Sequence, residues 1–167
     1  VIRGHVPEIE LIAVADPAVD RRGEALEDAA ERGGLTVYRS AEALLEKARP
    51  QIAIITTNPL QHCEQVLMAA DYGCHIFCEK PLALSPEEAD RMVTAVRKAG
   101  VVCTVDFETI FSDSFLVLRE QLQREEFGRL IRFDAVDKGR PPAYDIETCM
   151  PHFLHAFMVL TGSRPVE

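Results

Sequence analysis

The sequence predicts an α/β fold with a doubly wound parallel sheet, and two observations carry that prediction. Short apolar runs alternate regularly with helical segments through residue 105, and glycines close three of those helices. Such alternation implies right-handed crossovers between parallel strands, with helices covering both faces of the sheet. From residue 106 the rhythm changes, so we expect one domain over residues 1–105 and the start of a second, α+β domain over residues 106–167.

The expected strands of the first domain are apolar runs of the kind that parallel sheets bury on both faces. They cover residues 10–16, 35–38, 51–56, 74–78 and 101–105. The helices between them are expected over residues 20–32, 40–47, 59–73 and 85–100. The last has the clearest start, because Ser85 can cap it, Pro86 fits its first turn and Glu88 can complete a capping box.

The region after residue 106 has a mixed pattern. A helix is expected over residues 114–125, a strand over residues 130–136 and a second helix over residues 146–160. Pro151 lies inside that last stretch, so the helix should kink there or begin later. With no obvious closing element after it, this second domain is expected to be incomplete.

Composition argues against several classes of partner. Of the 167 residues 47% are hydrophobic, and the formal net charge is −9, so neither nucleic acid nor an anionic membrane is expected to attract the chain. No apolar run is long enough to cross a bilayer and no secretion signal opens the chain, which favours the cytosol. The five cysteines are irregularly spaced, which is atypical of a secreted disulfide framework.

Three of the potential metal ligands, Cys74, His75 and Cys78, are close together in the sequence. In a strand, however, successive side chains point to opposite faces of the sheet, and no second cysteine pair lies at zinc-site spacing. We therefore expect buried thiols here and no metal site.

Asp16 stands at the carboxyl end of an expected strand, the edge at which doubly wound folds bind nucleotides. Its carboxylate can accept both hydroxyls of an adenosine ribose and would repel a 2′-phosphate, which favours NAD over NADP. Arg21 or Arg22 can instead favour the phosphorylated ribose. Equally, Asp16 with Pro17 can open a turn and cap the following helix.

Polar residues also follow the strand expected over residues 51–56. Thr57 and Asn58 end that strand, and His62 lies in the first turn of the next helix. Polar groups and free amides at this position suit a ribose or phosphate contact. The alternative is ordinary loop chemistry in which Asn58 caps the helix.

The most informative stretch is Glu79-Lys80-Pro81, which directly follows the strand expected over residues 74–78. Its proline fixes the backbone, so the ammonium of Lys80 is held at the carboxyl edge of the sheet. A lysine there can hydrogen-bond a substrate hydroxyl and assist proton transfer during hydride transfer. The alternative is a solvated loop with two opposite charges.

His152 and His155 are three residues apart and would share one face of a helix. His152 can act as a proton shuttle near neutral pH. The pair is also a possible metal half-site, but the sequence shows no third ligand. Partly buried, hydrogen-bonded histidines are the structural alternative.

Together these features resemble the Gfo/Idh/MocA oxidoreductases, which include glucose–fructose oxidoreductase and inositol dehydrogenase. The resemblance covers essentially the whole chain, and its most specific part is Glu-Lys-Pro at this distance after a histidine. Its residues are Asp16, Thr57, His62, Glu79-Lys80-Pro81, the segment 105–111 and His152.

The resemblance implies a Rossmann-type dinucleotide-binding domain over residues 1–105, then the start of a substrate domain whose open sheet pairs subunits into homodimers or homotetramers. It implies an NAD- or NADP-dependent dehydrogenase that moves a hydride between nicotinamide and a hydroxyl-bearing carbon of a sugar-like or polyol substrate. Lys80 would contact substrate and nicotinamide, and His152 would orient the substrate or carry its proton. The residues implied to line the cofactor cleft are Asp16, Thr57, Asn58, His62, Glu79 and Pro81.

The sequence departs from the family pattern at several points. The family's opening strand and glycine-rich turn are absent, so a protein that begins at Val1 is expected to bind the cofactor poorly. Proline and asparagine are exchanged in Thr57-Asn58-Pro59. Thr148 stands where the family often has an aspartate, and Glu108 and Ile110 replace the usual asparagine and arginine. A threonine hydroxyl cannot act as a carboxylate base, so the substrate or the chemistry can differ from that of the sugar dehydrogenases.

Two other functions stay open beside the dehydrogenase. One is a non-catalytic sensor or regulator that binds dinucleotide without turnover, which Thr148 favours and the retained Lys80 and His152 oppose. The other is an NAD-dependent enzyme that cleaves glycosides through a transient oxidation. The first would not reduce its cofactor, and the second would form product without net NADH.

Overall fold

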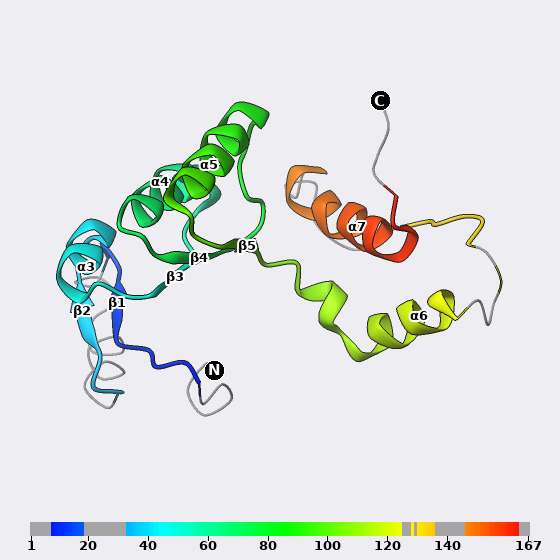
Figure 1. Cartoon of the computed structure of the whole chain (residues 1–167), viewed down its shortest axis with the longest axis horizontal. Helices are drawn as coiled ribbons and strands as arrows, with labels where there is room; N and C mark the ends of the chain where they lie inside the picture. Colours follow the sequence, from blue (N-terminus) through cyan, green and yellow to red (C-terminus); the bar gives the residue numbers. More distant parts are fainter. Residues whose placement is uncertain (1–7, 19–32, 125–127, 129, 136–145, 164–167) are drawn as a thin grey trace.

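The computed structural model describes residues 8–18, 33–124, 128, 130–135 and 146–163. The helix expected over residues 20–32 lies outside these residues. Figure 1 shows the strands with their covering helices as one part of the molecule, and two further helices that follow as another. The described elements are, in order, β1 (Ala13–Ala15), β2 (Thr36–Tyr38), α3 (Ala41–Ala48), β3 (Ile52–Ile55), η1 (Pro59–Gln61), α4 (His62–Asp71), β4 (His75–Cys78), α5 (Pro86–Ala99), β5 (Cys103–Val105), η2 (Glu108–Phe111), α6 (Asp113–Gln123) and α7 (Ile146–Thr161).

Every pair of adjacent described strands is parallel, which confirms the predicted α/β class. β1 pairs with β2 in one sheet, and β3, β4 and β5 form a second sheet in that order. In the second sheet Ile54 lies opposite Phe77, which in turn lies opposite Thr104. Among the described residues the predicted parallel sheet is present as two separate sheets, because no described strand joins β1 to β3.

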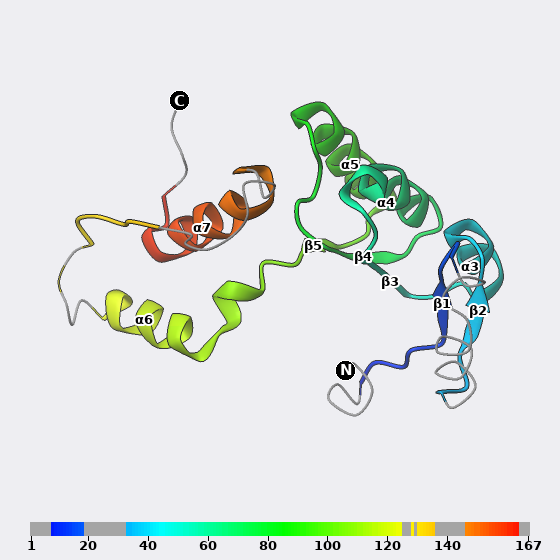
Figure 2. The same ribbon diagram turned by 180° about the vertical axis from the view of Figure 1, so that it is seen from behind.

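The hydrophobic core lies between β3–β5 and the helices α4 and α5, which run side by side over one face of that sheet (Figures 1 and 2). Val66 and Met92 come from the two helices, and Ile76 and Cys78 come from the sheet. On the other face of β3, Ile52 and Ile54 are partly exposed, 45% and 40% respectively. Helices cover only one face of this sheet among the described residues.

Local sequence signals explain where the helices start and stop. The Ser40 hydroxyl accepts a hydrogen bond from the Ala43 amide at the start of α3. Ser85 accepts in the same way from the Glu88 amide, while the Glu88 carboxylate accepts from the Leu84 amide rather than from that of Ser85. The predicted capping box is therefore present with its return bond displaced by one residue.

The region after β5 agrees only partly with expectation. α6 begins at Asp113, one residue earlier than predicted, and α7 continues through Pro151 without a later start. The prediction of a strand over residues 130–136 is wrong for residues 130–135, which form no regular structure. A strand needs a partner to receive its backbone hydrogen bonds, and this segment meets none, so Ile131 is 90% exposed.

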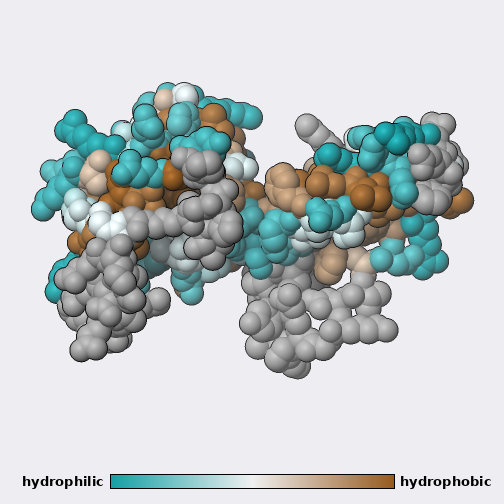
Figure 3. Space-filling view, turned by 90° about the horizontal axis from the view of Figure 1, so that it is seen from below, coloured by the Kyte–Doolittle hydropathy of each residue, from teal (hydrophilic) through white to brown (hydrophobic). Residues whose placement is uncertain are grey.

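Apolar surface remains visible in this second region. Figure 3 shows hydrophobic side chains gathered on the part of the molecule that contains α6 and α7. Val117 of α6 and Leu154 of α7 are both substantially exposed. None of the helices within the described ranges has the length and apolar character needed to span a membrane.

The α4–α5 core should dominate stability. Met92 is 1% exposed, while its neighbour Val93 is 38% exposed on the same helix. We expect Met92→Ala to lower the free energy of unfolding by about 2–5 kcal/mol, because it leaves a cavity between α5 and the sheet. Val93→Ala should change it by no more than about 0.5 kcal/mol. Urea denaturation followed by circular dichroism checks both, and equal losses would contradict this placement of the core.

Candidate functional site

The carboxyl ends of β3, β4 and β5 meet at one edge of the sheet. Backbone hydrogen bonds extend the pairing past the strands: the Glu79 amide donates to the Ile55 carbonyl, and the Asp106 amide donates to the Cys78 carbonyl, both at 2.9 Å. The residues that follow the strands are therefore held side by side. This edge is where an open parallel sheet binds ligands.

His62 connects two of these strand ends. Its side chain is fully buried, with Nδ1 2.8 Å from the Pro81 carbonyl oxygen and Nε2 3.1 Å from the Thr57 carbonyl oxygen. Carbonyl oxygens only accept hydrogen bonds, so a singly protonated ring satisfies one contact and a doubly protonated ring satisfies both. His62 thus clamps the loop after β3 to the loop after β4.

The loop after β3 is ordered by its own polar groups. The Thr57 hydroxyl donates to Gln65 Oε1 at 2.9 Å. The Asn58 side chain accepts from the Leu60 amide at 3.0 Å and caps η1, as the structural alternative in the sequence predicts. Thr57 is half-buried and Asn58 is exposed at the sheet edge.

The loop after β4 holds Glu79, Lys80 and Pro81 in one defined conformation. Glu79 Oε2 accepts from the Lys80 amide at 3.1 Å, and the Lys80–Pro81 peptide bond is cis. Pro81 is buried, while Glu79 and Lys80 are half-buried. The predicted position of Lys80, at the carboxyl edge next to a buried strand, is therefore the position it has.

Asp16 lies on the other sheet, at the carboxyl end of β1. Its amide donates to the Tyr38 carbonyl at 3.0 Å, and its Oδ1 accepts from the Ala18 amide at 2.8 Å. The carboxylate thus orders the turn after β1, which is one of the two predicted roles. Arg21 and Arg22 lie outside the described residues.

A second cluster forms where α7 meets the segment that leaves β5. The Phe107 ring stacks on His155 with centroids 4.2 Å apart and meets His152 edge-on at 6.0 Å. His152 Nδ1 lies 3.6 Å from Glu108 Oε2. Burial, followed by the nearby His152, lowers the pKa of His155, so its neutral form is favoured in the cluster.

Asp106 links this cluster to the β4 loop. Burial raises the pKa of its carboxyl group, the negative charges of Glu79 and Glu108 raise it further, and His152 opposes them. Asp106 therefore interacts electrostatically both with Glu79, in the loop that carries Lys80, and with His152 of α7. Sequence reasoning did not select Asp106, although it follows its strand just as Asp16 follows β1.

None of the cysteines whose side chains are described takes part in this site. Cys74 and Cys78 are buried, as predicted, while His75 is exposed and accepts a hydrogen bond from the Val102 amide. Burial raises the pKa of the Cys78 thiol to about 12. Within the described ranges no three His, Cys, Asp or Glu side chains are grouped to hold a metal ion.

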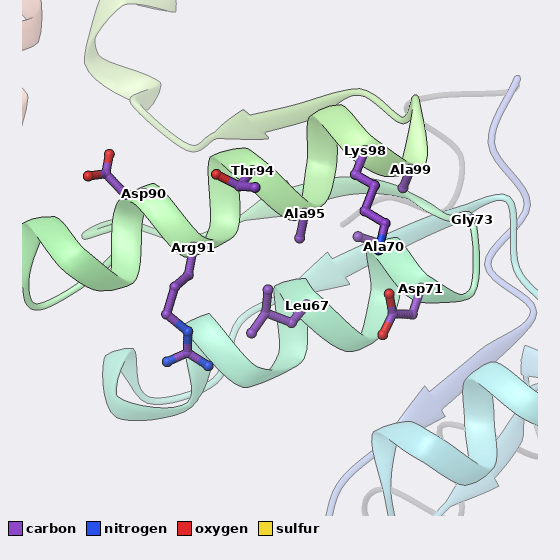
Figure 4. Close-up of a pocket in the computed structure, with 10 residues that line it drawn as sticks. All are labelled: Leu67, Ala70, Asp71, Gly73, Asp90, Arg91, Thr94, Ala95, Lys98 and Ala99. Atoms are coloured by element: carbon purple, nitrogen blue, oxygen red, sulfur yellow. The ribbon is translucent and has the colours of Figure 1, made fainter.

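A groove of about 700 Å³ lies elsewhere, between α4 and α5. Its floor is formed by small and apolar side chains such as Leu67, Ala70 and Ala95, with Arg91 and Lys98 above it (Figure 4). Gly73 and Ala99 close it where both helices end, so much of it lies toward the opposite end of the strands from Glu79. We assign no chemistry to this groove.

Known proteins support the assignment of this sheet edge. Residues 2–107 match the family model GFO_IDH_MocA, described as an oxidoreductase family with an NAD-binding Rossmann fold. The chain belongs to the Gfo/Idh/MocA oxidoreductase family. The resemblance inferred from Glu79-Lys80-Pro81 is thereby confirmed, and so is the Rossmann-type fold.

Two of the similar proteins are named as dehydrogenases of a glucoside and of an inositol. The chain is 34% identical over 123 residues to D-glucoside 3-dehydrogenase of Escherichia coli, covering 74% of this chain and 34% of the relative. It is 32% identical over 140 residues to the scyllo-inositol 2-dehydrogenase (NAD(+)) of Bacillus subtilis, covering 83% and 40%. A putative dehydrogenase structure from Bordetella bronchiseptica matches with a TM-score of 0.79 and 29% identity, covering 95% and 44%. The chain thus spans less than half the length of each.

The His62 clamp predicts a local change in dynamics. His62→Ala should lower the free energy of unfolding by about 2–4 kcal/mol, because the hydrogen bonding of the ring to the Pro81 and Thr57 carbonyls is lost and a cavity remains. Hydrogen exchange at residues 57–61 and 79–84 should accelerate. His75→Ala, which removes an exposed histidine from neighbouring β4, is the matched control and should cost about 1 kcal/mol or less. Unchanged exchange in both loops would rule out the clamp.

Asp106 predicts a pH-dependent effect. Because its pKa is raised on folding, the native state binds this proton more tightly than the unfolded chain, and ionisation of Asp106 at neutral pH is destabilising. Asp106→Asn should stabilise the protein at pH 7 by roughly 0.5–1 kcal/mol, and the gain should vanish as acidification protonates the wild-type carboxyl. Thermal unfolding from pH 4 to 8 measures this. Asp90→Asn, at an exposed position of α5, should not raise the stability at pH 7. A stabilisation by Asp106→Asn that grows as the pH falls would contradict the predicted direction.

Proposed function

We propose that the protein containing this chain is an NAD(P)-dependent dehydrogenase that oxidises a hydroxyl-bearing carbon of a sugar-like or polyol substrate. The observation that carries the proposal is the loop of Glu79, Lys80 and Pro81, held at the carboxyl edge of the sheet by His62 and lying in the same charged neighbourhood as His152. Membership of an NAD-binding oxidoreductase family supports it.

The residues at the sheet edge fit a dinucleotide. A ribose needs hydrogen-bonding groups at the carboxyl ends of parallel strands. This edge offers the Glu79 carboxylate and the Thr57 hydroxyl, and the end of β1 on the other sheet offers the Asp16 carboxylate. Asn58 and Pro81 would complete the walls of the cleft. His62, being fully buried, would act by positioning Thr57 and Pro81 rather than by touching the cofactor. Asp16 favours NAD over NADP because a carboxylate repels a 2′-phosphate.

The chain's own contribution to the reaction would be proton handling. When bound, the nicotinamide supplies the acceptor for the hydride, the hydrogen that leaves carbon with both C–H electrons. The hydroxyl must give up its proton at the same time so that a carbonyl forms. Lys80, in its amine form, would accept the hydrogen bond of the substrate hydroxyl, which holds the oxygen in place, and would then take that proton. His152 would orient the substrate and relay the proton.

The remaining expectations concern the whole protein. The substrate domain that begins after residue 106 would pair copies into homodimers or homotetramers. We expect the protein to act in the cytosol, since its five irregularly spaced cysteines are atypical of a secreted disulfide framework. Neither nucleic acid nor membrane enters this proposal.

Calorimetry and turnover test the proposal together. NAD+ and NADP+ would be titrated into this chain and into a form carrying the family's opening strand and glycine-rich turn ahead of Val1. In the form that binds, Lys80→Met should keep cofactor binding and lose at least ~100-fold in kcat/KM on sugars or polyols, because a proton acceptor is removed. Lys98→Met, an exposed lysine of α5, is the control and should leave both unchanged.

The outcomes separate the competing functions. Absence of dinucleotide binding in both forms would overturn the oxidoreductase. Binding without any reduction of NAD+ would favour the sensor, and product without net NADH would favour the glycoside-cleaving enzyme.

A further inference from the structure

His152 presents a buried nitrogen that lacks a hydrogen-bond partner. Its Nδ1 is shielded from solvent, and among the described residues no atom satisfies it. Buried polar atoms are nearly always paired, because an unpaired one costs about 1–3 kcal/mol. Nδ1 does face one charged group, Glu108 Oε2, at 3.6 Å. This distance is just beyond a hydrogen bond.

The backbone on both sides of this contact is held in place. Phe107, directly before Glu108, stacks on His155 at an interplanar angle of 24° and meets His152 edge-on at 86°. Glu108 is the first residue of η2, which packs against α7. The backbone of Glu108 is therefore held beside the imidazole, although the Glu108 side chain is 65% exposed.

Other charged groups interact with this ring or with its neighbours. Asp106 lies at the end of β5, Glu79 lies in the loop after β4, and His155 lies one turn further along α7. Among the described residues, Glu108 is the carboxylate with an oxygen within 4 Å of the His152 ring. Asp106 interacts with His152 only through the longer-range field, and it shares that field with Glu79 and Glu108.

We propose that Glu108 is the positioning residue of His152: its carboxylate accepts the Nδ1–H, fixes the ring tautomer and leaves the Nε2 lone pair to receive a proton. A carboxylate in this relation to a histidine both orients the ring and stabilises its protonated form. The partner comes from η2, while Thr148, one turn before His152 on α7, is a residue type that carries no carboxylate. The proposal rests on the function assigned to His152 above.

The 3.6 Å separation is consistent with this role. Glutamate reaches its partner through rotatable bonds, so a small rotation of an exposed side chain closes the gap. Contacts between catalytic groups are often longer in structures without substrate and shorten when the site fills. Because solvent screens an exposed ion pair, we expect the Glu108 carboxylate to favour the Nδ1–H tautomer of His152 measurably but modestly.

Ring nitrogen chemical shifts of His152 test the proposal on the full chain without any cofactor. Long-range ¹H–¹⁵N correlation spectra at pH 8.5 should show His152 mainly as the Nδ1–H tautomer in the wild type. In Glu108→Ala the ring should move toward the Nε2–H tautomer that a solvated imidazole prefers, by at least about 2-fold in the tautomer ratio, the size expected for a partly exposed pair. Glu108→Asp should partly restore the wild-type ratio.

Two comparisons separate positioning from folding. Glu120→Gln removes an exposed glutamate of α6 that pairs with Arg124, and it should leave the His152 ratio unchanged. The thermal midpoint of Glu108→Ala should match that of the control, since Glu108 packs little surface. If Glu108→Ala keeps the His152 tautomer ratio of the wild type, the proposal is overturned.

The measurement distinguishes failure of this proposal from failure of the proposed function. Loss of the Nδ1–H preference in Glu108→Ala, in a protein that binds NAD+, supports both inferences. An unchanged ratio in a protein that binds NAD+ and turns over substrate overturns the role of Glu108 and leaves the dehydrogenase in place. A shifted ratio in a protein that binds no dinucleotide supports the positioning of His152 by Glu108 and overturns the dehydrogenase.

Discussion

Parallel pairing of β3, β4 and β5 is the constraint on which the candidate site depends. Because the three strands run in the same direction, Thr57, Glu79 and Asp106 leave the sheet at one edge. Two backbone hydrogen bonds beyond the strands, from the amides of Glu79 and Asp106, hold those exits in register. The apolar face that α4 and α5 cover anchors this arrangement, since a shift of one residue would turn Ile76 and Cys78 away from the core.

The polar edge is tied to that apolar core by His62. A fully buried imidazole is costly unless its nitrogens are paired, and here both face carbonyl oxygens. One side chain therefore determines the relative position of two loops that are 19 and 5 residues away from it in sequence. The loop that carries Lys80 is therefore held by a buried side chain, His62, through its contact with the Pro81 carbonyl.

Charged side chains also shape the sheet edge. Asp106 interacts with Glu79, Glu108 and His152, and burial opposes the ionisation of its carboxyl group. Phe107 contacts both His152 and His155 and so holds α7 against the segment after β5.

The sequence by itself determined the α/β class, the helix caps at Ser40 and Ser85, and the position of Glu79-Lys80-Pro81 after a strand. These depend on local periodicity, capping and turn chemistry, which act over a few residues. Only the tertiary structure decided that His62 is a buried clamp, that residues 130–135 form no strand, and that Glu108 of η2 faces His152. Each depends on which segments meet in space: a strand needs a neighbour, and a pair needs two elements packed together. Spacing along the chain carries no record of either.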